Sequence, residues 1–394
     1  MIDEGWARTA ELLSSSHDLL DERPQRGGPL NALASRGWDE WLLALSDADL
    51  DGIEIAGVDA SWPASAPSTL RALVDAVREA TAVSSIAAPS AAVERPARRR
   101  EPHRKRIQVD AMASLIGPLA DGAGRVVDVG SGHGHLSREL AARVGRAVVG
   151  LERSAARVQR ARALEASGEV SFRVSDVLVD GLGLEAGDLA VGLHACGELG
   201  DAIVIEAARA GAGVALVGCC LQKQRGATRR ALAKREGETA IDLDRELLGL
   251  SNLTPRDRGV EATRAENLAA RARRVALHLL LSEHVPGLRF GAVLEGLNRR
   301  AAHAELGVLV QRAFRARSLP APSPREVERA LDEARALHAR ARRLSVPRNL
   351  FGRVIEVFVA FDRARYLAER GRVVEVGALF PAEVSARNLV LLAP

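Results

Sequence analysis

Apolar runs and amphipathic stretches alternate along the middle of the chain. The runs are short and rich in Val, Leu and Ala, which predicts β-strands at 125–129, 147–152, 170–176, 188–193 and 213–218. Between them, apolar positions recur at helical spacing, most clearly over 136–144, 154–164 and 201–210. Strands that alternate with helices form a parallel sheet covered on both faces, so this pattern predicts an α/β fold.

The flanking segments show mainly helical spacing. The first of them contains all four tryptophans, which we interpret as its core. The last combines one amphipathic helix with two apolar runs, expected to add an antiparallel strand pair to the sheet. The predicted segments are a helical N-terminal region at 1–94, a basic linker at 95–106, the α/β core at 107–220, a helical insertion or lid at 221–352, and a helix and strand pair at 353–394 that completes the core sheet.

A glycine-rich turn joins the first predicted strand to the first helix, and the second strand ends in an acid. The candidate cofactor-binding residues here are Asp128, Gly130, Ser131, Gly132, Gly134 and Glu152. Glycines let the backbone approach a ligand, and a carboxylate offers two acceptors to neighbouring hydroxyl groups. A dinucleotide site requires glycine at the position of His135, so the spacing argues against a pyrophosphate.

Composition narrows the classes of protein only in part. With 394 residues, 47% of them hydrophobic, the chain can bury one large core and carry a second module. The formal net charge is +4 and the basic residues are nearly all arginine, which admits nucleic acid as a partner without requiring it. The start of the chain lacks the features of a signal peptide, and three cysteines cannot build a disulfide framework. We therefore expect a cytoplasmic protein.

The loop and its partner acid resemble motif I of the class I S-adenosylmethionine (SAM) methyltransferases. The resemblance implies a Rossmann-like sheet, here with a helical N-terminal region and a helical insertion. It also implies that the loop lies against the methionine part of SAM and that Glu152 binds both ribose hydroxyls. Asp176 ends the third predicted strand, where such enzymes bind the adenine amino group. The alternative for Asp176 is a loop aspartate that caps the next helix.

Histidine and cysteine residues follow two adjacent predicted strands. The segment Gly192-Leu-His-Ala-Cys-Gly-Glu-Leu199 contains His194 and Cys196, and Cys219 and Cys220 follow the fifth strand. These are all the cysteines of the chain. Because ligands bind at the carboxyl ends of parallel strands, we expect these side chains to face one site.

The loop, the fourth-strand segment and the cysteine pair together resemble the methyltransferase-like protein 25 family, which is related to the CHHC-type tRNA 2'-O-methyltransferases. The resemblance covers about 102–220 and the segment Val384-Ser-Ala-Arg-Asn-Leu389, with a weaker likeness around 248–252. The chain departs from the family in having His133 where lysine is usual, and in lacking the zinc-finger cysteines. The resemblance implies an RNA acceptor, either tRNA or rRNA.

Three interpretations of the candidate catalytic residues His194, Cys196, Cys219 and Cys220 remain open. In the first, they line the acceptor pocket, and His194 is the base where the acceptor must lose a proton. In the second, a cysteine is the nucleophile of a pyrimidine carbon-5 methyltransferase, although the prolines and threonine that flank such cysteines are missing. In the third, the cluster binds zinc. Neighbouring side chains of an extended strand point to opposite faces, which argues against joint ligation by the cysteine pair.

A dense basic run precedes the helix that leads into the first strand. Such a run is typical of a solvated linker, but its position near the cofactor domain also suits an arm that contacts phosphates. The residues expected to contact RNA are Arg98, Arg99, Arg100, Arg104, Lys105 and Arg106. A protein side chain is the alternative acceptor, and a SAM-binding regulatory protein without transfer activity is the alternative from another class.

Overall fold

The computed structural model describes residues 2–26, 29–86, 103–165, 168–233, 241–253 and 263–394. The chain separates into two compact units. The sheet unit comprises Met1–Leu20, Ala72–Asp257 and Asn349–Pro394, and the helical unit comprises Asp21–Arg71 and Arg258–Arg348. The segment 1–94, expected as one region, is therefore shared between the two units, and the predicted insertion joins the helical unit only from residue 258 onward.

A seven-stranded sheet forms the centre of the sheet unit. Its order is β3 (Val170–Val174), β2 (Ala147–Glu152), β1 (Arg125–Val129), β4 (Leu189–Cys196), β5 (Gly213–Cys219), β9 (Leu389–Ala393) and β8 (Glu375–Ala378). Strands β1 to β5 are parallel, β9 runs antiparallel to β5, and β8 runs antiparallel to β9. The predicted α/β sheet, closed by an antiparallel pair, is confirmed.

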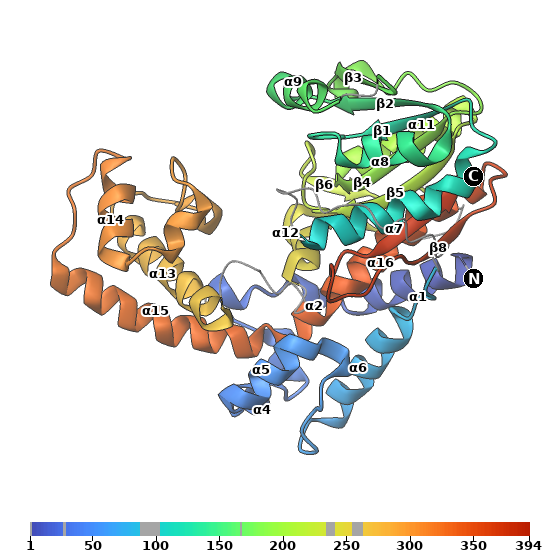
Figure 1. Cartoon of the computed structure of the whole chain (residues 1–394). Coiled ribbons are helices and arrows are strands. Elements are labelled where there is room, and N and C mark those ends of the chain that lie inside the picture. Colours follow the sequence, from blue (N-terminus) through green and yellow to red (C-terminus); the bar gives the residue numbers. More distant parts are fainter. Residues whose placement is uncertain (1, 27–28, 87–102, 166–167, 234–240, 254–262) are drawn as a thin grey trace. The chain divides into compact units, whose positions relative to one another are not determined.

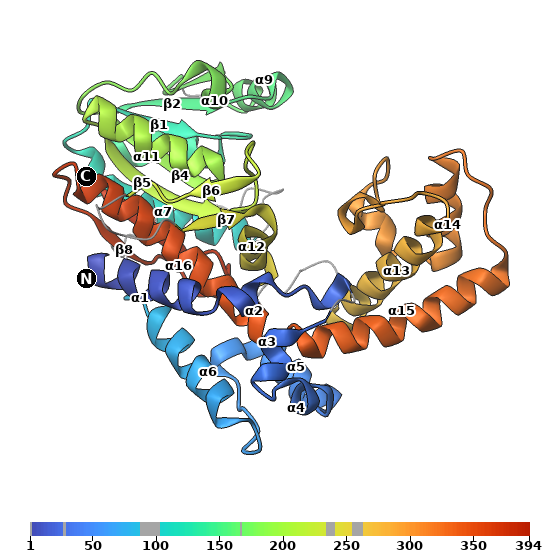
Figure 2. The same cartoon turned by 180° about the vertical axis from the view of Figure 1, so that it is seen from behind.

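Helices cover both faces of this sheet. One face packs against α7 (His103–Ala120), α8 (His135–Val144) and α9 (Ala155–Ala163), and the other against α10 (Val177–Asp180), α11 (Glu198–Ala210) and α16 (Val346–Ala368) (Figures 1 and 2). Successive strand residues alternate between the two cores: Val126 packs on the α7 face and Val127 on the α11 face. Because both faces are covered, β1, β2, β4 and β5 are mostly apolar in the sequence.

A buried ion network ties α11 to α16. Arg229 bridges Asp201 and Asp362 at 2.9 and 2.7 Å, and Arg363 donates to Asp201 at 2.8 Å. Arg229 lies in β6 (Thr228–Arg230), which pairs antiparallel with β7 (Asp242–Asp244). The sequence pattern predicted a helical insertion or lid from residue 221 onward. The short strand forms instead because the Arg229 side chain is buried, where two carboxylates compensate its charge.

The helical unit is built from segments far apart in the sequence. Its helices are α3 (Asn31–Ser35), α4 (Asp39–Leu43), α5 (Asp47–Ala56), α13 (Arg264–Ser282), α14 (Leu306–Arg315) and α15 (Pro324–Leu344). Capping boxes at Thr263 and Ser323 begin α13 and α15. Leu277, Leu309 and Phe314 lie in the apolar core that α13, α14 and α15 share.

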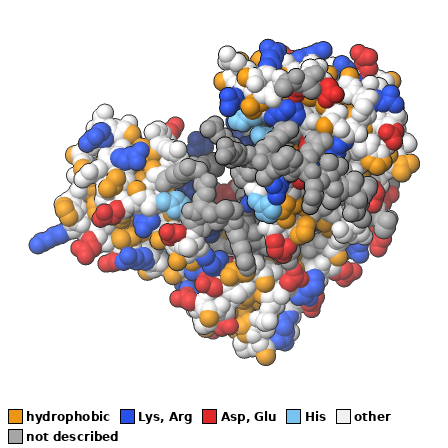
Figure 3. Space-filling model, in the orientation of Figure 1, with side chains coloured by type: hydrophobic (Ala, Val, Ile, Leu, Met, Phe, Trp, Pro, Cys, Tyr) orange, Lys and Arg blue, Asp and Glu red, His pale blue; other side chains and the backbone are white. Residues whose placement is uncertain are grey.

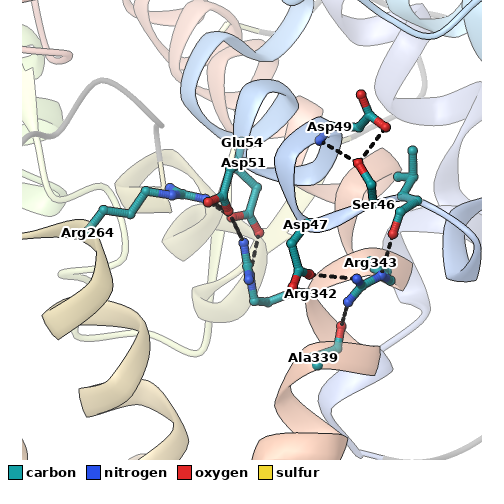
Figure 4. A network of polar contacts seen from close by, with 10 residues as sticks. Ser46, Asp47, Asp49, Asp51, Glu54, Arg264, Ala339, Arg342 and Arg343 are labelled. Carbon is teal, nitrogen blue, oxygen red and sulfur yellow. Dashed lines mark hydrogen bonds and ion pairs between the residues drawn. The ribbon is translucent and has the colours of Figure 1, made fainter.

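Ion pairs join the early segment of the helical unit to the late one. Asp51 and Glu54 of α5 lie between Arg264 of α13 and Arg342 of α15 (Figure 4). Asp51 accepts from these arginines at 2.8 and 2.6 Å, and Glu54 accepts from Arg342 at 2.8 Å and also from Arg264. These contacts explain why residues 47–56 belong with 264–348.

The remaining α-helices of the described ranges are α1 (Ile2–Ser15), α2 (His17–Asp21), α6 (Ser68–Ala80) and α12 (Arg245–Leu250). Within those ranges, no helix combines the length and the apolarity needed to cross a bilayer.

Candidate active site

The glycine-rich loop between β1 and α8 is fixed to the end of β2. The N–H groups of Gly130 and Ser131 donate to the Leu151 carbonyl at 2.8 and 3.0 Å. Gly130, Gly132 and Gly134 have φ values of 76°, 59° and 73°, in the left-handed region that favours glycine. The sequence thus places glycine where the backbone requires it, and the loop makes a tight turn at the carboxyl edge of the sheet.

Glu152, the acid at the end of β2, holds this loop with both of its oxygens. Oε2 accepts from the N–H of Gly132 at 3.2 Å, and Oε1 accepts from the N–H of Ser154 at 2.9 Å. The side chain is buried, and Arg157 lies 3.6 Å from Oε2. The carboxylate is therefore held in one orientation beside the loop, as the ribose-binding role requires.

Asp128, next to the last residue of β1, supports the loop from beneath. It is 2% exposed and accepts a hydrogen bond from Ser137 Oγ of α8 at 2.5 Å. Burial raises the pKa of Asp128 to about 6, an effect that the Ser137 hydrogen bond opposes. The contact connects the strand, the loop and the first turn of α8.

Asp176 lies after β3, at the same edge of the sheet, and is the N-cap of α10. Its Oδ1 accepts from the N–H of Leu178 at 3.3 Å, and its own N–H donates to Asp180 at 2.9 Å. The helix-capping alternative is thus what the structure contains. The adenine contact stays a prediction, and the exposed Asp176 side chain is accessible for it.

A cavity of about 440 Å³ opens between the loop and the ends of β4 and β5. Asp128, Gly130, Ser131 and Gly132 line one side of it. Ser131 Oγ is buried beside Gly150 and has no hydrogen-bond partner among the described residues. A turn of exposed backbone, a fixed carboxylate and a polar side chain fit the amino-acid and ribose parts of SAM.

His194 also lines the cavity. It interrupts β4: the register with β5 shifts between Leu193 and Ala195, and His194 has a φ of 67°, which is rare for a residue with a side chain. Its Nε2 lies 2.7 Å from Oε1 of Gln108 in α7. Burial lowers the pKa of His194, and the charges of Arg387 and Arg104 lower it further, so the ring is neutral near pH 7 and can accept a proton.

The cysteine side chains meet at the ends of β4 and β5. Cys196 and Cys219 are register partners with their sulfurs 3.2 Å apart, and Cys219 Sγ lies 3.1 Å from the His194 carbonyl oxygen. Cys220 lies beyond β5 with a φ of 42°. All three Sγ atoms are within 4.8 Å of one another. The geometric argument against joint ligation by the pair was wrong, because the chain turns at Cys220 and is no longer an extended strand.

The surroundings of Cys219 and Cys220 shift the pKa values of their thiols in opposite directions. Hydrogen bonds from the thiols of Cys196 and Cys219 lower the pKa of Cys220, and the nearby charges of Arg387 and Lys223 act in the same direction. The same contacts, together with burial, raise the pKa of Cys219. Cys220 is half-buried and lines the cavity, so its sulfur is the one most available as a thiolate.

Several residues in or next to the cavity come from segments that the sequence pattern did not assign to the site. Arg387, from the turn before β9, lines the cavity and donates to Asn252 Oδ1 at 2.8 Å. Asn252 donates in turn to Gln222 at 2.7 Å. Lys223 Nζ lies 3.6 Å from Cys196 Sγ. The segments 384–389 and 248–252 carried part of the family resemblance, which was the available signal for Arg387 and Asn252, whereas Gln108 had none.

The basic run meets the cavity through its last part. Arg104 and Lys105, in the first turn of α7, line the cavity, and Arg104 Nε donates to the Val384 carbonyl. Arg106 lies 3.2 Å from His103 Nδ1 instead. Arg98, Arg99 and Arg100 lie outside the described residues.

Part of the chain matches a known family of domains. Residues 104–226 match a family model described as a methyltransferase domain. The crystal structure of the N-terminal domain of EvdMO1 with SAH bound is 20% identical over 35% of this chain and 66% of its own, with a TM-score of 0.25. The sugar N-methyltransferase KedS8 from Streptoalloteichus sp. is 16% identical over 43% of this chain and 90% of its own, also with a TM-score of 0.25. The crystal structure of EvdMO1 is 19% identical over 46% and 52%, with a TM-score of 0.23.

The sheet order, the loop geometry and the domain match define a Rossmann-like SAM-dependent methyltransferase domain. SAM is its cofactor and supplies a methyl group bound to a sulfonium sulfur. In this chain, the loop from Gly130 to Gly134 and the Glu152 carboxylate would hold SAM, and His194 lines the same cavity.

Proposed function

We propose that this protein transfers the methyl group of SAM to RNA, as a relative of the methyltransferase-like protein 25 family. The observation that carries the proposal is the sign of the charge around the cavity. Arg104, Lys105 and Arg387 line it together with the loop and His194. Guanidinium and ammonium groups are the usual partners of phosphate oxygens, so an RNA backbone can place one nucleotide at the acceptor side.

The local charge at the cavity matters more than the charge of the whole surface. Basic and acidic side chains are interspersed over the face seen in Figure 3. Among the cavity-lining residues, Asp128 is the one acid, and its carboxyl group lies beneath the loop. A polyanion is therefore favoured at this opening rather than over the domain as a whole.

The chemistry at the acceptor side suits an oxygen or a nitrogen that loses a proton. The His194 ring is fixed by Gln108 and is neutral, so it can take that proton as the methyl group leaves the sulfonium sulfur and bonds to the acceptor. In-line displacement needs positioning above all, which the rigid ends of β4 and β5 provide.

Transfer of tritiated methyl from SAM into small RNA tests the proposal, using RNA isolated from a strain that lacks the gene. Label that survives protease and is lost with ribonuclease is the expected result. Label in protein, or no label with SAM binding intact, contradicts it. A paired change of Arg104→Gln and Lys105→Gln should weaken RNA binding and reduce its salt dependence without altering SAM affinity. Arg230→Gln, at a side chain 79% exposed in β6, is the matched control.

A further inference from the structure

The three cysteine sulfurs form a compact donor set at the wall of the cavity. Cys196 and Cys219 end paired strands, and Cys220 follows in the turn, so sheet hydrogen bonds fix the backbone that presents them. Their Sγ atoms all lie within 4.8 Å of one another. These are the only cysteines of the 394-residue chain, and the fold brings every one of them to a single place.

We propose that Cys196, Cys219 and Cys220 bind a Zn²⁺ ion as thiolates, with the fourth ligand position open to the cavity. Thiolates are preferred ligands of zinc, and a tetrahedral site with Zn–S bonds of about 2.3 Å separates its sulfurs by about 3.8 Å. The observed separations run from 3.2 Å to at most 4.8 Å and bracket that value, so small rotations of the side chains suffice. Three protein ligands with an open fourth position are typical of catalytic zinc sites.

The charges around the cluster balance such a site. Three thiolates and one Zn²⁺ carry a net charge of −1, and Lys223 Nζ lies 3.6 Å from Cys196 Sγ. Arg387 lines the same cavity as Cys219 and Cys220. Binding breaks three S–H bonds and forms three Zn–S bonds, and the three protons go to solvent.

An open zinc position beside His194 has a consequence for catalysis, which rests on the proposed function. A hydroxyl is a very weak acid, and one imidazole is a weak base for it. A Zn²⁺ ion held by the three thiolates would supply Lewis-acid chemistry to a hydroxyl of the acceptor. The metal site itself does not depend on the identity of the acceptor.

Metal analysis of the full-length protein tests the site without any RNA. The protein is purified under reducing conditions without chelators, and its zinc content is measured by mass spectrometry of the elements. We expect about one zinc per chain. Replacement by Co²⁺ should give the intense thiolate-to-cobalt absorption of a sulfur-rich tetrahedral site. This spectrum needs no substitution, so it does not depend on whether a variant folds.

Variants then assign the ligands. Cys196→Ser, Cys219→Ser and Cys220→Ser should each lose zinc while calorimetry still detects SAM binding. His194→Gln is the matched control, because His194 lies in β4 two residues before Cys196 but contributes no sulfur. This variant should keep its zinc. Zinc retained in the three serine variants would overturn the proposal.

Thiol titration tests the alternative that two of these cysteines form a disulfide. The unfolded protein, prepared without reductant and treated with chelator, should show three reactive thiols. One reactive thiol and no zinc would mean a disulfide, and three reactive thiols with neither zinc nor cobalt bound would mean no metal site. Either result overturns the zinc site and leaves the RNA proposal to its own test.

Discussion

At the scale of single residues, we assign two roles to Glu152. Its two oxygens accept from Gly132 and Ser154, so it orders the loop and can also bind the ribose. Glu152→Ala removes these acceptors, and we expect SAM affinity to fall by about 1–3 kcal/mol, or roughly fivefold to 150-fold. Calorimetry measures the change, with Glu185→Ala, at a side chain 82% exposed, as the control. Equal affinity in both variants would exclude Glu152 from the ribose site.

Asp128 makes stability depend on pH. Burial raises its pKa from 3.8 to about 6, so the folded protein keeps a proton that the unfolded chain releases. The stabilisation is complete below about pH 4 and is lost as the pH rises through about 6, a fall of about 3 kcal/mol in the free energy of unfolding. Asp128→Asn should remove this part of the profile. Urea denaturation of both proteins over that range measures it, and parallel profiles would contradict the assignment.

Sequence patterns identified the site residues that lie close together in the chain and follow a recognisable spacing. The loop glycines and Glu152 lie within one strand–turn–helix–strand segment, so local rules place them together. Gln108 and Arg387 reach the same cavity from a helix and a turn far apart in the chain. Their positions depend on how α7 and β9 pack on the sheet, which local patterns do not encode.

At the scale of elements, the turn after β4 depends on Gly197. This residue has a φ of 49°, and a Cβ here would overlap the Lys223 carbonyl in the turn after β5. Gly197→Ala should therefore push apart the two turns that carry the cysteines and destabilise the protein by about 2–4 kcal/mol. Gly211→Ala is the control, with a φ of 72° but no close neighbour, and should cost about 1 kcal/mol. Urea denaturation compares them, and equal losses would mean that backbone strain alone matters.

Elements with a buried apolar face were predicted well, and those held by polar contacts were not. Strands β1, β2, β4 and β5 are buried on both sides, so their composition identified them, whereas Ser171 and Arg173 of β3 are exposed. The β6–β7 ribbon has short, charged strands without an apolar alternation. Its position follows from the contacts of Arg229 with Asp201 and Asp362, which only the folded chain reveals.

At the scale of the whole molecule, the division into units could not be derived from the helical pattern. Helical spacing shows that a face is buried but not which segment covers it. Residues 21–71 and 258–348 form one unit because α5 exchanges ion pairs with α13 and α15 (Figure 4). The two helical regions are separate in the sequence but form one unit in the folded chain.

The two-unit organisation predicts that stability and cofactor binding can be changed separately. Arg342 of α15 donates to Asp51 and Glu54, and its side chain is 13% exposed. Arg342→Ala should destabilise the helical unit by about 2 kcal/mol, because the partly buried Glu54 carboxylate then has one partner fewer. Arg335→Ala, on the same helix but 64% exposed, should change stability by less than about 0.5 kcal/mol.

Limited proteolysis with mass mapping would show the loss as earlier cleavage within 21–71 and 258–348. SAM affinity should stay unchanged in both variants, because every residue assigned to the cofactor belongs to the sheet unit. A fall in SAM affinity in step with the cleavage rate would mean that the cofactor site requires an intact helical unit. The helical unit would then take part in forming the site, and truncation of residues 258–348 could not leave a competent methyltransferase domain.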